Sequence, residues 1–258
     1  MGQQQQTSPT KHGPTAQAHD AAQNPSRIRL LDAATHIIRA KGYAATTVDD
    51  ICHRAGVTKG SFFHHFKSKD DLALAAVAHW EAKTAIFFAA APYHQVQDPL
   101  DRLLGYLDFR AAILTGELAD TTCLLGTLVQ ETYATHPEIR AACELALSAH
   151  IAELTRDVEA AKQLYAPDAT WSAESVGNFM QAVLQGSFIL AKAEQSPEVI
   201  RQNLDQLRRY LRALFQPDSQ LEAKKEGHHR LASHPKLVEK PVEEPEEEYD
   251  SQRSHFVD

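Results

Sequence analysis

Residues 55–66 read Ala55-Gly56-Val57-Thr58-Lys59-Gly60-Ser61-Phe62-Phe63-His64-His65-Phe66, the pattern of a tight turn followed by a short helix. Gly56 can adopt the positive φ angle that such a turn needs, and Thr58 is placed to cap the helix. Phe62 and Phe66, four residues apart, can share the buried side of that helix. The outward side then carries Lys59, Ser61 and His64.

Two further helices are expected before this turn. The first, residues 27–41, has one apolar face, and the charged Arg39 is expected outside it. The second, residues 47–54, is short, and Thr46 with Asp49 forms a variant of the capping box at its start. The apolar face of the first helix comprises Leu30, Leu31, Ala34, Ile37 and Ile38.

Three helices in this order, the last two joined by a glycine turn, make a helix-turn-helix unit. The last helix has a size that fits the major groove of DNA, where its first residues meet base edges and its hydroxyls and lysines meet phosphates. Gly60, near the start of that helix, allows a sugar-phosphate chain to approach closely. The sequence therefore predicts a DNA-binding head.

The same residues resemble the TetR-type bacterial transcriptional repressors, in order and at the spacing of that family. The resemblance implies that the helix at 59–65 is the recognition helix and that the next helix joins the head to an effector-binding body. The matching segments are Leu30–Ala34, Lys41–Tyr43, Thr46–Val48, Ile51, Ala55–Phe66 and Lys67–Lys69.

The resemblance also assigns roles by position. Residues matching positions that touch phosphates are Thr47, Ser61, Phe63, His64 and Lys69, and those matching positions that reach bases are Val48 and Lys59. Phe63 departs from the family, which most often has a tyrosine there. The missing hydroxyl costs about 1 kcal/mol of backbone anchoring, for which His64 or His65 can compensate. The full set expected at DNA is Thr46, Thr47, Val48, Thr58, Lys59, Gly60, Ser61, Phe63, His64, His65 and Lys69.

Charge is distributed unevenly along the chain. The net charge of -8 argues against a nucleic-acid partner at first sight, but residues 26–70 carry eight Lys/Arg against four Asp/Glu, a local excess of +4. Residues 71–216 sum to -7 and residues 217–258 to -5. A basic module on an acidic body is compatible with a local phosphate-binding surface.

Composition sets the class of protein. A chain of 258 residues with 43% hydrophobic residues can form one large domain or two modest ones. Three cysteines, Cys52, Cys123 and Cys143, are an odd number, which favours a reducing cytosol over a disulfide framework. No long uncharged apolar run and no signal peptide are evident, so a cytoplasmic protein without a membrane partner is expected.

Period-3.6 patterning predicts an all-α core between two polar tails. The expected domains are a disordered arm (1–25), the helix-turn-helix domain (26–71), a helical effector-binding and dimerisation domain (72–216) and a disordered acidic tail (217–258). The tail histidines, His228, His229 and His234, lack the fixed geometry of a metal site. The expected helices are 27–41, 47–54, 59–65, 69–91, 99–115, 121–134, 137–165, 172–194 and 197–215.

The body is expected to hold a small-molecule effector and to form a homodimer, as the resemblance implies. Each pocket candidate is equally explained as ordinary core, and the alternative for the dimer candidates is packing within one subunit. Candidate pocket residues are Trp80, Phe87, Tyr106, Phe109, Arg110, Leu128 and Tyr133. Candidate dimer residues on the last two helices are Val176, Phe179, Val183, Gly186, Ser187, Leu190, Leu207 and Leu211.

Cys123 supports a separate hypothesis. It stands at the start of an expected helix, where the helix dipole can stabilise a thiolate, and the segment resembles one in relatives that sense oxidants or electrophiles. The alternative is a plain packing element.

The resulting hypothesis is a repressor, with activation left open, that binds a palindromic operator on double-stranded DNA and is released by a small molecule. No metal site or cofactor is expected. Two rivals are an all-helical enzyme or carrier, for which no catalytic motif at recognisable spacing is found, and a docking scaffold that uses the acidic tail.

Overall fold

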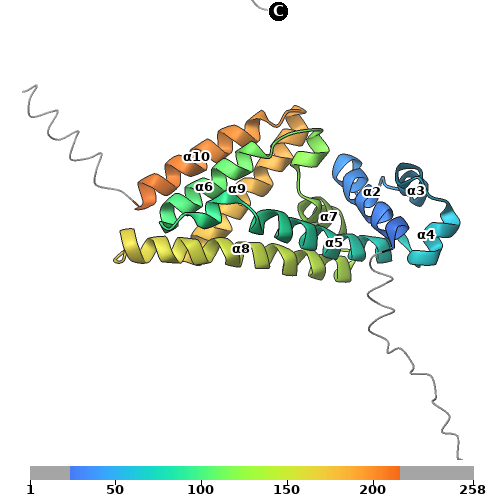
Figure 1. Cartoon of the computed structure of the whole chain (residues 1–258), viewed down its shortest axis with the longest axis horizontal. Helices are drawn as coiled ribbons and strands as arrows, with labels where there is room; N and C mark the ends of the chain where they lie inside the picture. Colours follow the sequence, from blue (N-terminus) through green and yellow to red (C-terminus); the bar gives the residue numbers. More distant parts are fainter. Residues whose placement is uncertain (1–23, 216–258) are drawn as a thin grey trace, which may run out of the picture. The chain divides into compact units, whose positions relative to one another are not determined.

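The structure is a computed structural model, and it describes residues 24–215. Within that range the chain is all-α, as predicted, with no strand (Figure 1). The predictions for residues 1–23 of the arm, for the acidic tail and for His228, His229 and His234 concern residues outside this range. The α-helices are α2 (Pro25–Lys41), α3 (Val48–Ala55), α4 (Lys59–His65), α5 (Lys69–Ala89), α6 (Pro99–Ala112), α7 (Leu124–Thr132), α8 (Pro137–Tyr165), α9 (Ala173–Glu194) and α10 (Glu198–Phe215), and the 3-10 helices are η1 (Pro92–Gln95) and η2 (Leu118–Thr121).

Most element boundaries agree with the sequence, and three differences have local causes. Helix α2 begins at Pro25, because the side chain of Asn24 accepts a hydrogen bond from the Ser26 amide at 3.0 Å. Helix α5 ends before Pro92, which holds the residue preceding it in an extended conformation. Helix α7 begins later than expected, because the hydroxyls of Thr121 and Thr122 bond back to carbonyls of η2.

Helices α2, α3 and α4 form the head, and aromatic burial holds it together. Phe62 and Phe66 are buried as predicted, and Cys52 is a buried small side chain. The apolar face of α2 packs onto them. Arg39, expected outside that face, is instead only 8% exposed.

The core of the head does not end at residue 71. The same buried cluster includes Leu72 and Ala76 from α5, Leu124 and Leu128 from α7, and Ile139 from α8. The N-terminal parts of α5 and α8, together with α7, therefore complete the core of the head. A movement of these helices must disturb head packing, since close-packed interiors transmit strain.

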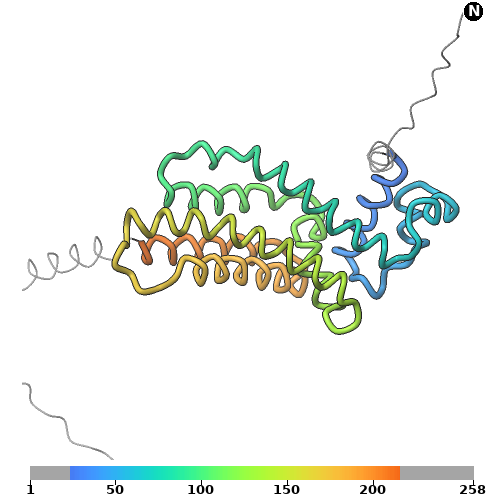
Figure 2. Tube along the Cα trace, turned by 90° about the horizontal axis from the view of Figure 1, so that it is seen from below, coloured from blue at the N-terminus to red at the C-terminus, as the bar shows by residue number. Residues whose placement is uncertain are grey.

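Helices α6, α8, α9 and α10 form the rest of the body, where α8, α9 and α10 run side by side (Figures 1 and 2). A second buried cluster lies between them and includes Leu103, Leu107, Val158, Met180 and Leu211. This cluster fixes the helices that surround the cavity described below.

Helix α5 is, in the described part of the chain, the one helix long and apolar enough by length and composition to cross a membrane. Core helices of globular proteins meet the same criterion. Its first half is buried against the head through Leu72, Ala73, Ala76 and Val77.

Candidate functional site

The start of α3 is capped one residue later than the sequence indicated. The Thr47 side chain accepts from the Asp50 amide at 3.1 Å, and Asp50 accepts from the Thr47 amide at 2.9 Å, a complete capping box. Thr46, predicted as the cap and as a DNA contact, is 1% exposed, and its hydroxyl donates to the Gly42 carbonyl at 2.6 Å. The predicted capping pair, Thr46 with Asp49, is therefore wrong by one residue. Thr46 does not lie on the surface.

The turn between α3 and α4 has the predicted geometry. Gly56 has a φ of 62°, in the left-handed region, and the side chain of Thr58 accepts from the Ser61 amide at 3.2 Å. Val57 packs on the head core. The exposed residues of the predicted DNA set are Thr47, Thr58, Lys59, Gly60, Phe63 and His64, and the half-buried ones are Val48, Ser61, His65 and Lys69.

Two predicted lysines have different surroundings. Lys59 is exposed, and its ammonium lies 2.8 Å from the Asp49 carboxylate of α3. Lys69 donates to the carbonyls of Tyr43 and Thr46, both at 3.1 Å, and its ammonium lies over the Tyr43 ring. Lys59 is thus available on the surface, whereas Lys69 fixes the loop that precedes α3.

The aromatic residues at the end of α4 differ in exposure: Phe63 and His64 are exposed, whereas His65 contacts Ser26. The Phe63 side chain is 59% exposed, and His64 is exposed beside it. His65 Nε2 lies 2.6 Å from the Ser26 hydroxyl, and burial, followed by the charges of His64 and Arg27, lowers the pKa of His65. Of the two histidines, His64 is the one free to meet a phosphate in place of the missing tyrosine hydroxyl.

Arg39 joins the head to the body. Its guanidinium donates to the Asp120 carboxylate at 3.1 Å and to the carbonyls of Asp120 and Thr122 at 3.1 and 3.3 Å. It also lies 4.8 Å from the centre of the Trp80 ring of α5. A residue of the first head helix is therefore bonded to η2 and packed on α5, a position that its charged character did not indicate in the sequence.

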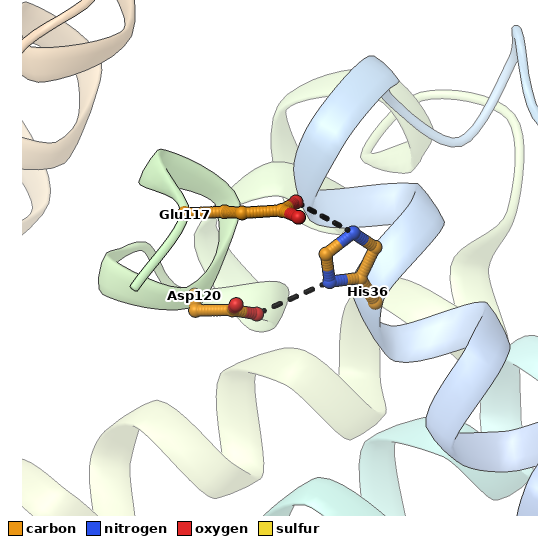
Figure 3. Close-up of side chains that lie close together, drawn as sticks. All are labelled: His36, Glu117 and Asp120. Carbon is orange, nitrogen blue, oxygen red and sulfur yellow. Dashed lines mark hydrogen bonds and ion pairs between the residues drawn. The ribbon is translucent and has the colours of Figure 1, made fainter. Parts of the chain in front are cut away.

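His36, one turn before Arg39, reinforces this junction (Figure 3). Its Nδ1 lies 3.1 Å from an Asp120 oxygen, and its Nε2 lies 3.4 Å from a Glu117 oxygen. These three side chains are close enough to be considered as a metal site. In the structure each ring nitrogen faces a different carboxylate, and these are the contacts of an imidazole that bridges two carboxylates.

A second bond between head and body comes from α7. The Glu131 carboxylate accepts from the backbone amides of Tyr43 and Ala44 at 3.0 and 2.7 Å, just after α2 ends. Gly42 has a φ of 90°, and any side chain there would collide with this carboxylate. Helix α7 and η2 therefore hold opposite sides of the α2 terminus.

A cavity of about 400 Å³ lies directly beneath this junction. Helices α5, α8 and α9 form much of its wall, and Arg39, Asp120 and Cys123 close the end nearest the head. Its volume is in the range of small-molecule sites. The predicted pocket residues that line it are Trp80, Phe87 and Arg110.

The other four predicted pocket residues lie elsewhere. Leu128 is fully buried in the head core, and Tyr133 is 65% exposed at the end of α7. Tyr106 and Phe109 pack behind the wall, against Phe88. Side-chain character alone does not distinguish these positions, because all four are large apolar or aromatic residues on body helices.

The cavity also contains His150, a polar residue that the sequence did not single out. His150 Nε2 lies 3.0 Å from the Tyr106 hydroxyl. Burial, and then the positive charge of Arg110, lower the pKa of His150 to about 4, so the ring is neutral at neutral pH. Cys123 is a free, half-buried cysteine at the N-cap of α7, in the cavity wall.

The predicted dimer residues divide into a buried and an exposed group. Val176, Ser187, Leu207 and Leu211 are buried within the subunit, which corrects their assignment to an interface. Phe179 is 44% exposed, and its ring lies 5.0 Å from that of Tyr210 on α10. Of the other predicted dimer residues on α9, Leu190 is exposed and Val183 and Gly186 are half-buried, and the neighbouring Ile189 is exposed.

Two family models match this chain. Residues 30–76 match bacterial regulatory proteins of the tetR family, and residues 99–206 match the C-terminal domain of LmrA/YxaF-like transcriptional regulators. The matches include both the head and the helices around the cavity.

Among curated proteins, the transcriptional regulator AcuR of Cereibacter sphaeroides is 30% identical over 175 residues, covering 66% of this chain and 77% of that protein. A transcriptional repressor of Mycobacterium tuberculosis is 38% identical over 74 residues, covering 28% of this chain and 39% of its own.

Solved structures share the fold. A regulatory protein TetR from Rhodobacter sphaeroides superposes with a TM-score of 0.66 at 24% identity, covering 72% of this chain and 98% of that one. NemR from Escherichia coli, in its reduced form, gives 0.59 at 21% identity, covering 70% and 95%.

The lowered pKa of His150 generates a pH prediction. Its folded value of about 4 lies below the ordinary value of about 6.5, so the unfolded chain takes up the proton first as the pH falls. Stability is therefore lost between about pH 6.5 and 4. From pH 7.5 to 5.0, urea denaturation should show a loss about 2 kcal/mol larger for the wild type than for His150→Gln. Identical pH profiles would contradict a neutral buried imidazole.

Proposed function

This chain belongs to the TetR family of bacterial transcriptional regulators, and we propose that it binds a palindromic operator as a homodimer and leaves it when a small molecule enters the cavity. The observation that carries the proposal is the junction at Arg39, where one side chain belongs to the DNA-binding head, bonds η2 and lines the cavity. Members of this family are regulators and not enzymes.

The head supports reading of the major groove through α4. Lys59 and Val48 are the proposed base contacts, while Thr47, Thr58, Ser61 and His64 are proposed to meet phosphates. Gly60 leaves open space beside the helix start, since an added Cβ would meet only the Thr58 hydroxyl oxygen, at 3.7 Å. Phe63 is proposed to pack on sugar atoms of the DNA. Lys69 is proposed to act indirectly, by fixing the loop that precedes α3.

Release follows from a shift between two conformations. An effector must prefer the conformation whose two heads cannot span both half-sites, about 34 Å apart. Helix α5 is the proposed lever, because its first half is buried in the head core and its second half lines the cavity. A change in cavity shape therefore displaces residues on which the head is packed.

The proposed dimer surface is the exposed apolar strip of α9 and α10. Phe179, Leu190 and Ile189 are large and exposed on α9, and Tyr210 extends the strip onto α10. Gly186 has no neighbour within 4 Å of an added Cβ, so a partner backbone can approach closely there. Repression in the cytoplasm is the proposed mode and place of action.

The DNA contact of Lys59 can be tested once the operator is obtained by selecting bound oligonucleotides from a random pool. Lys59→Ala should weaken operator binding by about 1–3 kcal/mol per half-site and binding to unrelated DNA far less. Fluorescence anisotropy over a salt series measures both affinities. Lys83→Ala, an exposed lysine on α5 paired with Asp32, is the control and should change neither. Equal losses on both DNAs would mean that Lys59 touches only the backbone.

The dimer surface predicts an effect on subunit mass. Phe179→Glu and Leu190→Glu should each convert the dimer to single subunits in sedimentation equilibrium, because a buried unpaired carboxylate is costly. Leu145→Glu on α8 is the matched control, since Leu145 is also exposed and apolar. A wild type that sediments only as single subunits, or glutamate variants that remain dimers, would rule out this surface.

We also propose that Cys123 makes the regulator responsive to oxidants, because its sulfur is free and lies in the cavity wall. Hydrogen peroxide should release operator DNA from the wild type and not from Cys123→Ser. Cys143→Ser, which removes a fully buried thiol, should behave as the wild type. Unchanged release from Cys123→Ser would end the hypothesis.

A further inference from the structure

Arg110 is a cation of the cavity wall for which the surrounding protein provides no anion. Its Nε is buried without a hydrogen-bond partner, and no carboxylate lies within ion-pair distance of its guanidinium among residues 24–215. A buried polar group without a partner is costly, and such groups concentrate at binding sites.

The neighbours of Arg110 are aromatic and uncharged. Its guanidinium carbon lies 4.9 Å from the centre of the Phe88 ring and 5.6 Å from that of Tyr106. A guanidinium over a ring uses its face, and its N–H donors lie in its plane, where they stay available to an acceptor. The neutral His150 adds no second positive charge that would compete for the same anion.

The carboxylates of the cavity wall do not satisfy Arg110. Asp120 is bonded to Arg39, and Glu153 lies 3.9 Å from His150 Nδ1. Glu81 also lines the cavity but is exposed, and it forms no ion pair with Arg110 in the described part of the chain. Among the described residues, Arg110 is therefore a basic position of the cavity that no carboxylate pairs with directly.

A second polar atom marks another side of the cavity. Gln181 of α9 is 7% exposed, and its Oε1 is buried without a partner in the part of the chain that the structure describes. An amide can present either its oxygen or its nitrogen, so this position can bond a donor or an acceptor. The wall between these two polar positions includes apolar side chains, among them Phe88, Leu184 and Phe188.

We propose that the effector is a small organic acid whose carboxylate is bound by Arg110, whose apolar or aromatic body lies against Phe88 and Phe188, and whose second polar group meets Gln181. This inference rests on the proposed function, because it gives the chemical class of the effector of the same cavity. A charge-assisted bond to a planar guanidinium supplies the selectivity for an acid over its neutral analogue.

Two fluorescent probes that differ by one charge test the proposal on the full chain. 1-Anilinonaphthalene-8-sulfonate is an aromatic anion, and N-phenyl-1-naphthylamine is the same fluorophore without the sulfonate. Titration should show that Arg110→Gln weakens binding of the anion at least tenfold and changes that of the neutral probe less than twofold. Arg156→Gln, an exposed arginine of α8, is the control and should affect neither.

The neutral probe also reports whether the cavity of the variant is intact. Equal losses of affinity for both probes would show that Arg110 only shapes the cavity. An unchanged affinity for the anion would show that the sulfonate does not bind Arg110. Either result overturns the proposal. DNA binding is measured on the same preparations without probe. If DNA binds and the anion ignores Arg110, the effector class alone is wrong; if the anion needs Arg110 and no DNA binds, the regulator proposal alone fails.

Discussion

The burial of one guanidinium, that of Arg39, is the constraint on which the arrangement of this protein depends. A charge so far from water is stable only when its donors are satisfied, and Asp120, two backbone carbonyls and the Trp80 ring meet that need. These partners belong to η2, to the segment after it and to α5. The first head helix therefore cannot rotate or shift without breaking bonds that also shape one end of the cavity.

The burial of apolar side chains is a second link between head and body, because the two have a shared core. Residues 26–71 alone do not enclose Phe62 and the α2 face, and Leu124, Leu128 and Ile139 complete the packing. The head is thus stabilised by helices that also line the cavity. In a bundle with separate cores, a change around a ligand would be absorbed locally, whereas here α5, α7 and α8 extend from the cavity wall into the head.

The sequence was sufficient for local features and insufficient for those that depend on distant neighbours. The glycine turn, the Thr58 cap and the buried Phe62 follow from residues within one or two helical turns, and the structure has all three. Thr46 was exchanged with Thr47 because both can cap, and only the bond from Thr46 to the Gly42 carbonyl separates them. Leu128, Val176 and Arg39 were misplaced because their surroundings come from helices far along the chain, which no periodic pattern identifies.

The ion pair between Lys59 and Asp49 has a consequence for how such a protein searches a genome. A lysine that already has a carboxylate partner must exchange it for DNA, and a phosphate of arbitrary sequence offers a similar partner and little net gain. The edge of the correct base offers a directed acceptor in addition. With the proposed base contact of Lys59, the acid on α3 is expected to lower the dwell time on unrelated sequence more than on the target, which favours rapid scanning.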